Sequence, residues 1–304
     1  MPFELTVLGS SSATPTADRH PSAQILNIKD NLLLIDCGEA TQNQLLHYRI
    51  RHTRIKAIFI THLHADHFVG IFGLLATINF HGREDNLKLY APSDLKTIID
   101  TYFKISGIQL KFQLDFISTD DSMVHLIADE PDYQVHTVPL KHRLPTTGFI
   151  FTEKRPLKRL KPELCEAFHI PFSSYQSLKE GKDYVNTDGN IIQNYLLTED
   201  NPKPRSYAYM SDTLYLPQLA EVLHGVNLLY HESTFMHELL DRANETLHTT
   251  AKQAGMLAKA AGIKRLLLGH YSARYRDLTP LLFEAQKEFE NTLLAIEGEK
   301  YIVD

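Results

Sequence analysis

The sequence predicts an α/β fold, in which β-sheets form the interior and helices cover their outer faces. In both halves of the chain, short apolar segments typical of strands are followed by segments with the apolar spacing of helices. The 304 residues have a hydrophobic content of 43%, which is enough to bury a large core. We therefore expect a single domain over residues 1–304, interrupted by one insertion.

Strands and helices alternate in the first half of the chain. The segment 57–60 is continuously apolar, a pattern typical of a strand that is buried on both faces. Residues 27–31 contain the polar sequence of a turn between two strands. Strands are expected at 3–8, 23–28, 32–35, 57–60 and 87–90, and helices at 41–48, 68–79 and 92–103.

The second half repeats this alternation around an insertion. Segment 152–203 is rich in Pro, Lys, Asn and Asp and has weak apolar spacing, so we expect an arm inserted into the domain. Strands are expected at 135–140, 148–151, 207–210, 227–230 and 265–268, and helices at 216–223, 250–261 and 280–290.

The beginning of the arm is basic. Between Thr152 and Glu163 lie five basic residues and two acidic ones. This pattern suits either a solvated surface loop or a contact with a polyanion. The side chains considered as substrate contacts are Lys154, Arg155, Lys158 and Arg159.

Composition narrows the class of protein. The formal net charge is −6, so binding to a nucleic acid would need a local basic patch. No apolar run is long enough for a transmembrane helix, and the N-terminus has no signal-peptide pattern. Only Cys37 and Cys165 are present, which indicates a reducing compartment rather than a disulfide framework. We expect a cytoplasmic enzyme that does not associate with membranes.

The segment 61–67 contains a dense group of potential metal ligands. His62, His64, Asp66 and His67 directly follow the predicted strand 57–60. Four such ligands are too many for one metal with an open position, but they suit half of a two-metal site. The alternative is a solvated, histidine-rich loop.

Further candidate ligands follow other predicted strands. They are His142, Asp212, the pair His231-Glu232, and His270. Because the carboxyl ends of strands in an α/β sheet deliver side chains to one edge, these residues are expected to meet. Taken singly, each histidine could be a surface or core residue, and Asp212 could cap a helix.

These motifs resemble those of the metallo-β-lactamase superfamily. His62, His64, Asp66 and His67 match its His-x-His-x-Asp-His motif, and Asp36-Cys37-Gly38 matches its Asp-x-Gly strand end. His142, Asp212 and His270 follow in the superfamily's order. The resemblance implies an αββα sandwich of two facing mixed sheets with outer helices, from which an arm projects.

Within the superfamily, the chain is similar to ribonuclease Z. His231-Glu232-Ser233-Thr234-Phe235 and His248-Thr249-Thr250 resemble two motifs of that family, and Gly269 to Tyr275 resembles its last ligand motif. The insertion lies where the family carries a substrate-binding arm. The family's Pro-x-Lys-x-Arg-Asn loop is altered, because only Pro15 and Arg19 of that pattern remain. Near Ser173-Ser174 the arm's usual Gly-Pro step is also replaced.

The resemblance implies a centre of two Zn²⁺ ions, although Mn²⁺ or Fe would accept similar ligands. His62, His64 and His142 would hold one ion, Asp66, His67 and His270 the other, and Asp212 would bridge them. The two ions would lower the pKa of a shared water to give a hydroxide nucleophile, and Asp66 would accept its proton.

The same resemblance assigns the leaving-group side of the reaction. His248, oriented by Glu232, would protonate the departing oxygen, unless it only caps the helix that begins near Thr250. His231 would not hold a metal itself, but would fix the position of Glu232 or of a ligand carboxylate. Arg274 could bind a substrate phosphate or form a structural salt bridge.

The implied activity is that of a homodimeric hydrolase, an endonuclease that removes the 3′ trailer of precursor tRNA and leaves a 3′-hydroxyl. The first alternative is a phosphodiesterase of the same superfamily that acts on a small cyclic or alkyl phosphodiester. A second alternative is a non-catalytic, metal-stabilised RNA-binding protein. Turnover of bis(p-nitrophenyl) phosphate would exclude this second alternative.

Overall fold

The computed structural model describes residues 2–119, 122–154, 157–200 and 203–304. The chain separates into two compact units. The larger unit combines Met1–Thr152 with Arg205–Asp304, and the smaller unit is Glu153–Pro204. None of the described helices is long and apolar enough to cross a membrane.

The first sheet of the larger unit has the strand order β18-β1-β2-β3-β4-β5-β6. Strands β18, β1, β2 and β3 pair antiparallel, whereas β3 to β6 run parallel. The strands are β1 (Phe3–Gly9), β2 (Ala23–Ile28), β3 (Asn31–Cys37), β4 (Ile55–Phe59), β5 (Leu87–Ala91), β6 (Leu114–Ser118) and β18 (Lys300–Ile302).

The second sheet has the strand order β17-β16-β15-β14-β9-β8-β7. Strands β14 to β17 run parallel, and β9 pairs antiparallel with β14. The strands are β7 (His125–Asp129), β8 (Tyr133–Leu140), β9 (Thr146–Glu153), β14 (Ser206–Met210), β15 (Leu228–Glu232), β16 (Arg265–Gly269) and β17 (Thr292–Leu294).

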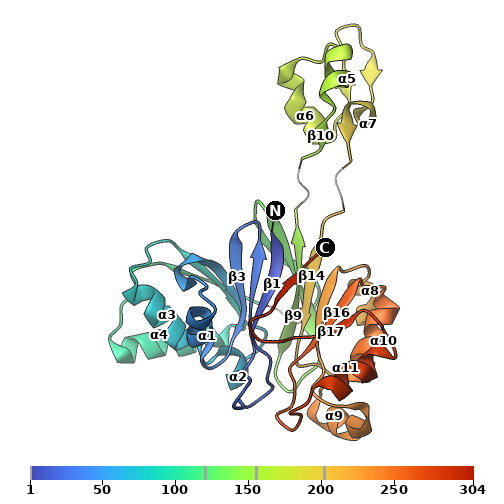
Figure 1. The fold of residues 1–304 in the computed structure, drawn as a ribbon. Coiled ribbons are helices and arrows are strands. Elements are labelled where there is room, and N and C mark those ends of the chain that lie inside the picture. The colour runs from blue at the N-terminus through green and yellow to red at the C-terminus, as the bar shows by residue number, and fades with distance from the viewer. Residues whose placement is uncertain (1, 120–121, 155–156, 201–202) are drawn as a thin grey trace. The chain divides into compact units, whose positions relative to one another are not determined.

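The helices of the larger unit lie outside the two facing sheets (Figure 1). On the side of the first sheet are α1 (Thr41–His47), α2 (Ala65–Phe68), α3 (Ile71–Phe80) and α4 (Asp94–Ser106). On the side of the second are α8 (Leu219–Val222), α9 (Leu240–Thr246), α10 (Ala251–Ala261) and α11 (Thr279–Gln286). Short 3₁₀ turns cover His52–Arg54 and His237–Leu239. This arrangement is the predicted αββα sandwich.

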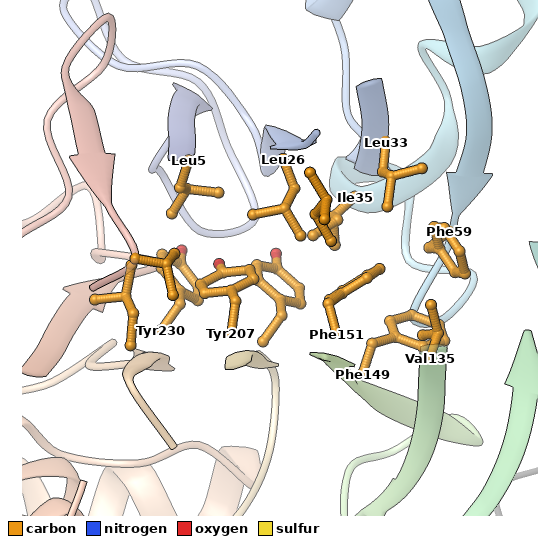
Figure 2. Close-up of a cluster of buried hydrophobic side chains, with 14 of the residues drawn as sticks. Leu5, Leu26, Leu33, Ile35, Phe59, Val135, Phe149, Phe151, Tyr207 and Tyr230 are labelled. Carbon is orange, nitrogen blue, oxygen red and sulfur yellow. The ribbon is translucent and has the colours of Figure 1, made fainter. Parts of the chain in front are cut away.

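Strand alternation divides the core into layers, because successive side chains of a strand point to opposite faces. Between the sheets, aliphatic side chains such as Leu5 and Leu26 face aromatic ones such as Phe151, Tyr207 and Tyr230 (Figure 2). Separate apolar clusters fill the space between each sheet and its helices. Because both faces of the central strands are buried, their sequences are almost continuously apolar.

The smaller unit has a core of its own. Cys165, Ile170, Leu178 and Leu197 are buried together, and the Asn194 side chain donates hydrogen bonds to two backbone carbonyls beside them. Its elements are β10 (Arg159–Leu160), α5 (Pro162–Ala167), a 3₁₀ turn (Phe172–Ser174), α6 (Tyr175–Lys179), β11 (Tyr184–Val185), β12 (Ile191–Ile192), α7 (Asn194–Leu197) and β13 (Thr198–Glu199). Within the unit, β10 pairs with β13 and β11 with β12.

Three predicted helices were wrong in extent, and the one expected at 280–290 ends at Gln286 as α11. The predicted helix 68–79 is divided into α2 and α3 at Gly70, whose backbone N–H donates to the Cys37 carbonyl at 2.9 Å. A Cβ on Gly70 would lie only 2.0 Å from the Gly38 oxygen, so a close approach of two backbones causes the break. The predicted helix 216–223 shortens to α8, because Pro217 disfavours helical geometry at the preceding residue.

The prediction also missed the edges of both sheets. The strands β6, β7, β17 and β18 each lie at an edge. They are short or partly exposed, so their apolar patterns are weak. The polar helix α9 was missed for the same reason.

Candidate metal centre

The predicted ligands gather at one edge of the two sheets. The motif of His62, His64, Asp66 and His67 lies just after β4 of the first sheet. From the second sheet, the ligands that follow β8, β14 and β16 are His142, Asp212 and His270. Both sheets therefore contribute to one pocket of about 420 Å³.

Two of these ligands, together with Asp36 near the end of β3, have a backbone conformation that residues other than glycine rarely adopt. The φ angles of Asp36, Asp212 and His270 are 54°, 55° and 55°. Each such residue costs about 1–3 kcal/mol and persists only where the surrounding structure holds it. At the end of a strand, this conformation turns the chain sharply and directs the side chain away from the strand.

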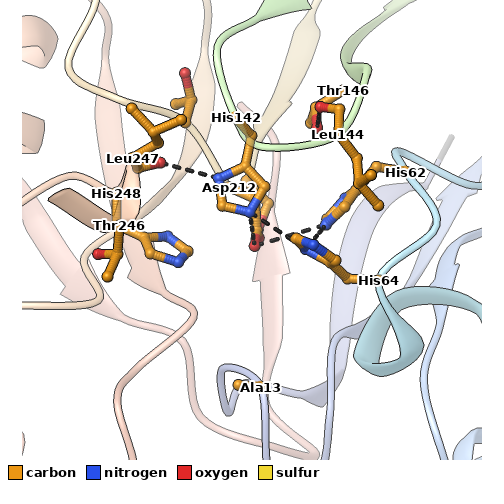
Figure 3. Close-up of polar contacts among 12 residues, drawn as sticks. Ala13, His62, His64, His142, Leu144, Thr146, Asp212, Thr246, Leu247 and His248 are labelled. Atoms are coloured by element: carbon orange, nitrogen blue, oxygen red, sulfur yellow. Dashed lines mark hydrogen bonds and ion pairs between the residues drawn. The ribbon is translucent and has the colours of Figure 1, made fainter. Parts of the chain in front are cut away.

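The first donor set consists of His62, His64, His142 and Asp212 (Figure 3). The Nδ1 atom of His64 lies 2.9 Å from His62 Nε2 and 3.2 Å from His142 Nε2. Asp212 Oδ2 lies 3.7 Å from each of these two Nε2 atoms. One cation could therefore contact three imidazoles and a carboxylate, the preferred donors of zinc.

The second donor set consists of Asp66, His67 and His270. The Nε2 atoms of His67 and His270 each lie 3.1 Å from Asp212 Oδ1. Although they are buried and close to a carboxylate, neither nitrogen makes a hydrogen bond of acceptable geometry. Buried polar atoms normally find a partner, so these two nitrogens are suited to contact a cation.

Asp212 contributes to both sets through different oxygens. Its Oδ1 faces His67 and His270, whereas its Oδ2 faces His62 and His142. A carboxylate in this position can bridge two cations. The residues present therefore fit a pair of divalent metal ions.

Hydrogen bonds orient most of these imidazoles through Nδ1. His62 Nδ1 lies 3.0 Å from the Thr61 hydroxyl, and His142 Nδ1 lies 3.0 Å from the Leu247 carbonyl. His270 Nδ1 lies 3.0 Å from the Thr234 hydroxyl. An Nδ1–H that donates to such an oxygen leaves the Nε2 lone pair directed at the centre.

The electrostatic environment favours the protonation states that metals require. Burial lowers the pKa of His62, His64 and His142, so these rings are neutral. Burial opposes ionisation of Asp212, but the neighbouring His270 and His67 hold its pKa well below the usual range. His67 is the exception, because Asp212, Asp66 and Asp36 outweigh burial and raise its pKa. A cation would replace that proton.

His248 lies at the same pocket and contacts Glu232. Its Nδ1 is 3.0 Å from Glu232 Oε1. Glu232 is buried at the end of β15 and also accepts hydrogen bonds from the Thr213 and Thr249 backbone N–H groups. Burial opposes charge on the His248 ring, but the Glu232 carboxylate raises the pKa of His248 to about 9. The helix cap is Thr250, whose side chain forms a capping box with Gln253.

The other predicted residues are not all brought to the pocket. His231 is buried on the opposite face of β15 from Glu232, and its Nδ1 lies 2.8 Å from the Glu232 backbone carbonyl. The Arg274 guanidinium lies 5.0 Å from the centroid of the Phe235 ring.

In the smaller unit, Lys158 forms an ion pair of 2.9 Å with Asp200. Lys154 is half-buried and Arg159 is exposed, whereas the prediction for Arg155 lies outside the described residues.

Several pocket residues were missed by the sequence reasoning. The Ala13 backbone N–H donates to Asp66 Oδ2 at 2.8 Å, which orients this ligand from the N-terminal loop. Arg143 and Arg242 line the pocket and are exposed. Arg143 could have been found beside the ligand His142, but no pattern in the sequence brings Arg242 to this site.

The sandwich and its paired donor sets define a metal-dependent hydrolase of the metallo-β-lactamase fold. A family model described as anti-Pycsar protein Apyc1 matches residues 3–147. A curated relative from Cytophaga hutchinsonii, named ribonuclease Z, is 44% identical over 100% of this chain and 97% of its own. One from Porphyromonas gingivalis with the same name is 40% identical over 97% of both chains. The chain therefore belongs to the ribonuclease Z family, and it is a metal-dependent endoribonuclease.

Solved structures agree with this assignment. The short form of human tRNase Z has a TM-score of 0.72 and 26% identity, over 99% of both chains. The metallo-β-lactamase fold protein YhfI from Bacillus subtilis has a TM-score of 0.70, over 99% of this chain and 98% of its own. Its identity of 18% indicates a shared fold only.

Proposed function

We propose that this chain is a zinc-dependent endoribonuclease that removes the 3′ trailer of precursor tRNA. The observation that carries the proposal is the orientation of Asp212, which turns one oxygen to each donor set in a pocket that also contains His248. The names of the relatives, ribonuclease Z and tRNase Z, support tRNA as the substrate.

The metal ions would supply the electrostatic part of the chemistry. When bound, two divalent cations lower the pKa of water toward neutrality and offset negative charge at the phosphate. His62, His64 and His142 would hold one ion, and Asp66, His67 and His270 the other, with Asp212 between them. Zn²⁺ is the preferred ion for these donors, although Mn²⁺ and Fe accept similar sets.

The protein's own groups would move the protons. Asp66, held by the Ala13 N–H, accepts the proton of the attacking water. Water attacks phosphorus, the bond between phosphorus and the tRNA 3′ oxygen breaks, and His248 protonates that oxygen. The tRNA therefore ends in a 3′-hydroxyl and the trailer carries the phosphate. Because its pKa is about 9, His248 is charged at neutral pH and can donate this proton.

The proposal includes the way in which substrate is held. The basic residues of the smaller unit supply contacts to tRNA phosphates. Without such a local positive charge, the acidic net charge of the whole chain would disfavour binding of tRNA. We also propose a cytoplasmic homodimer, on the basis of the family resemblance and the two free, buried cysteines.

The decisive experiment is cleavage of a 3′-extended precursor tRNA by the purified protein beside His64→Ala, with products mapped to the nucleotide. The proposal predicts one metal-dependent cut just after the discriminator base, absent in the variant. Hydrolysis of bis(p-nitrophenyl) phosphate is measured in parallel.

Turnover of the small phosphodiester without any cut in tRNA would instead support the small-molecule phosphodiesterase. The altered N-terminal loop is the feature that favours this alternative. In this loop His20 stands where the family pattern has Asn, and its Nδ1 lies 2.7 Å from Glu297 Oε2. The position of the family's Lys is occupied by Ala17, which has no charge to offer a phosphate.

A further inference from the structure

We propose that Tyr209 is a positioning residue of the metal centre, acting through Asp36 on His67. The inference rests on the proposed metal-dependent function. It concerns one hydroxyl group in the core between the sheets, which touches neither a ligand atom nor the substrate pocket.

The contacts form a continuous chain. The Tyr209 hydroxyl donates to Asp36 Oδ2 at 2.9 Å, and the same oxygen lies 2.7 Å from His67 Nδ1. The other carboxylate oxygen accepts hydrogen bonds from the backbone N–H of Thr61 at 2.9 Å and from its hydroxyl at 3.0 Å. Tyr209, Asp36 and His67 are all completely buried, so water does not replace a lost contact without rearrangement.

The direction of the Tyr209 hydrogen bond is settled by its surroundings. Burial raises the pKa of Tyr209 well above its usual range, and the negative charge of Asp36 raises it further. The hydroxyl therefore keeps its proton and donates it to the carboxylate. Because Tyr209 belongs to β14 and Asp36 to β3, this bond links the two facing sheets directly behind the ligands.

Among the described imidazoles of the two donor sets, His67 alone has a carboxylate at Nδ1. The corresponding partners of His62, His142 and His270 are hydroxyl or carbonyl oxygens. A carboxylate fixes the ring and strengthens the imidazole as a ligand. Oδ2 contacts the Tyr209 hydroxyl, His67 Nδ1 and, at 3.1 Å, the Thr61 hydroxyl. The hydroxyl of Tyr209 is therefore one of the groups that fix the carboxylate against which His67 is oriented.

The chain contains a matched control for this role. Tyr207 lies two residues earlier on the same face of β14 and is also completely buried. Its hydroxyl donates to the Gln24 side chain and not to Asp36. Figure 2 shows Tyr207 within the layer between the sheets. Tyr207→Phe therefore removes an equivalent buried hydroxyl without disturbing the contact to His67.

The test is titration of the metal-free full-length protein with Zn²⁺ alone, in competition with a chromophoric chelator. We expect Tyr209→Phe to weaken one of two zinc affinities roughly 10- to 100-fold and to leave the other unchanged. We expect Tyr207→Phe to match wild type at both. Proton NMR supplies an independent readout, in which the His67 Nδ1–H resonance shifts in Tyr209→Phe and not in Tyr207→Phe.

Three results would overturn the inference. They are equal effects of the two variants, equal weakening of both affinities by Tyr209→Phe, and a failure of metal-free Tyr209→Phe to fold, which would make its hydroxyl a support of the core. The proposed function fails differently. If wild-type protein bound no zinc, the metal centre itself would be refuted, and the inference with it.

Discussion

The carboxylate of Asp212 lies between two groups of imidazoles and presents a different oxygen to each. Its own orientation is held by a left-handed backbone and by the Ser211 hydroxyl, which donates to Oδ1 at 2.9 Å. A single carboxylate also has two effects on His248. The buried Glu232 orients the His248 ring and raises the pKa of His248. At the scale of residues, the site is therefore organised by buried carboxylates.

The role of Asp212 is testable by a change that keeps its shape. Asp212→Asn removes a charged carboxylate donor that both donor sets share, so bound metal falls from two ions to one or fewer per chain. Turnover of bis(p-nitrophenyl) phosphate falls by at least about 100-fold. Metal content is measured by elemental analysis, with the exposed Asp94→Asn as the control. Two tightly bound ions in Asp212→Asn would show that this residue does not bridge.

The role of His248 is testable by the choice of leaving group. His248→Ala removes the proton donor, so kcat on precursor tRNA falls by about 10²- to 10⁴-fold. Hydrolysis of bis(p-nitrophenyl) phosphate falls much less, because p-nitrophenolate departs without protonation. Steady-state kinetics on both substrates measure the difference, and the exposed His224→Ala serves as the control. Equal losses on the two substrates would contradict the role as an acid.

At the scale of elements, strand ends place the ligands while loops and the inserted unit add positive charge. The pocket has Arg143 in the loop between β8 and β9, and Arg242 on α9. The smaller unit adds a basic segment next to β10 and has an apolar core around Cys165. Neither group of basic residues is needed to hold metal, so both can be changed without altering the donor sets.

The pocket arginines are expected to contact phosphates that flank the one being cleaved. The double substitution Arg143→Ala with Arg242→Ala raises KM for precursor tRNA by about 10-fold or more, since each such contact contributes binding energy. Bis(p-nitrophenyl) phosphate has no flanking phosphate and keeps its KM. The exposed Arg54→Ala, which precedes the opposite end of β4, is the control. A parallel change in KM for both substrates would disprove the assignment.

The basic segment of the smaller unit is tested in the same way. Replacing Lys154, Arg155, Lys158 and Arg159 with Ala raises KM for precursor tRNA and flattens its dependence on salt concentration. Hydrolysis of the small phosphodiester is unchanged. Two exposed lysines of the larger unit, Lys104 and Lys259, are replaced as the control. If small-substrate hydrolysis fell equally, the segment would be structural.

At the scale of the whole molecule, the metal centre depends on the packing of one sheet against the other. The motif from His62 to His67 belongs to the first sheet, whereas His142, Asp212 and His270 belong to the second. The layer between the sheets contains many aromatic side chains, and Phe151 of β9 lies 5.1 Å from Phe59 of β4, ring centre to ring centre. Neither sheet alone contains a complete donor set with its bridge.

Loosening this layer is expected to weaken metal binding without touching a ligand. Phe151→Ala leaves a cavity and costs about 3–5 kcal/mol of unfolding free energy. Zinc affinity falls as well, because the ligands from the two sheets are no longer held at fixed distances from one another. Denaturant unfolding and zinc titration measure both effects. The control is Phe283→Ala on α11, where the side chain is 58% exposed and the cost is within about 0.5 kcal/mol.

The sequence alone determined the central strands, the order of the candidate ligands and the class of chemistry. Strands such as β3 and β16 have buried residues on both faces, so Leu32 to Ile35 and Leu266 to Leu268 form unbroken and recognisable apolar runs. The His-rich motif at 62–67 is recognisable because its ligands are adjacent in the chain. The family resemblance in the His231-Glu232 and His248 motifs also depended on local sequence.

Only the tertiary structure decided which residues share the site and how each is oriented. The edge strands β6, β7, β17 and β18 were missed because they are stabilised by a neighbouring strand more than by their own apolar pattern. His231 and Glu232 are adjacent in sequence, but strand alternation places them on opposite faces, and only Glu232 contacts His248. Arg242 reaches the pocket, and Tyr209 reaches Asp36, through the packing of distant segments. Such contacts are set by three-dimensional proximity, which no local spacing in the sequence records.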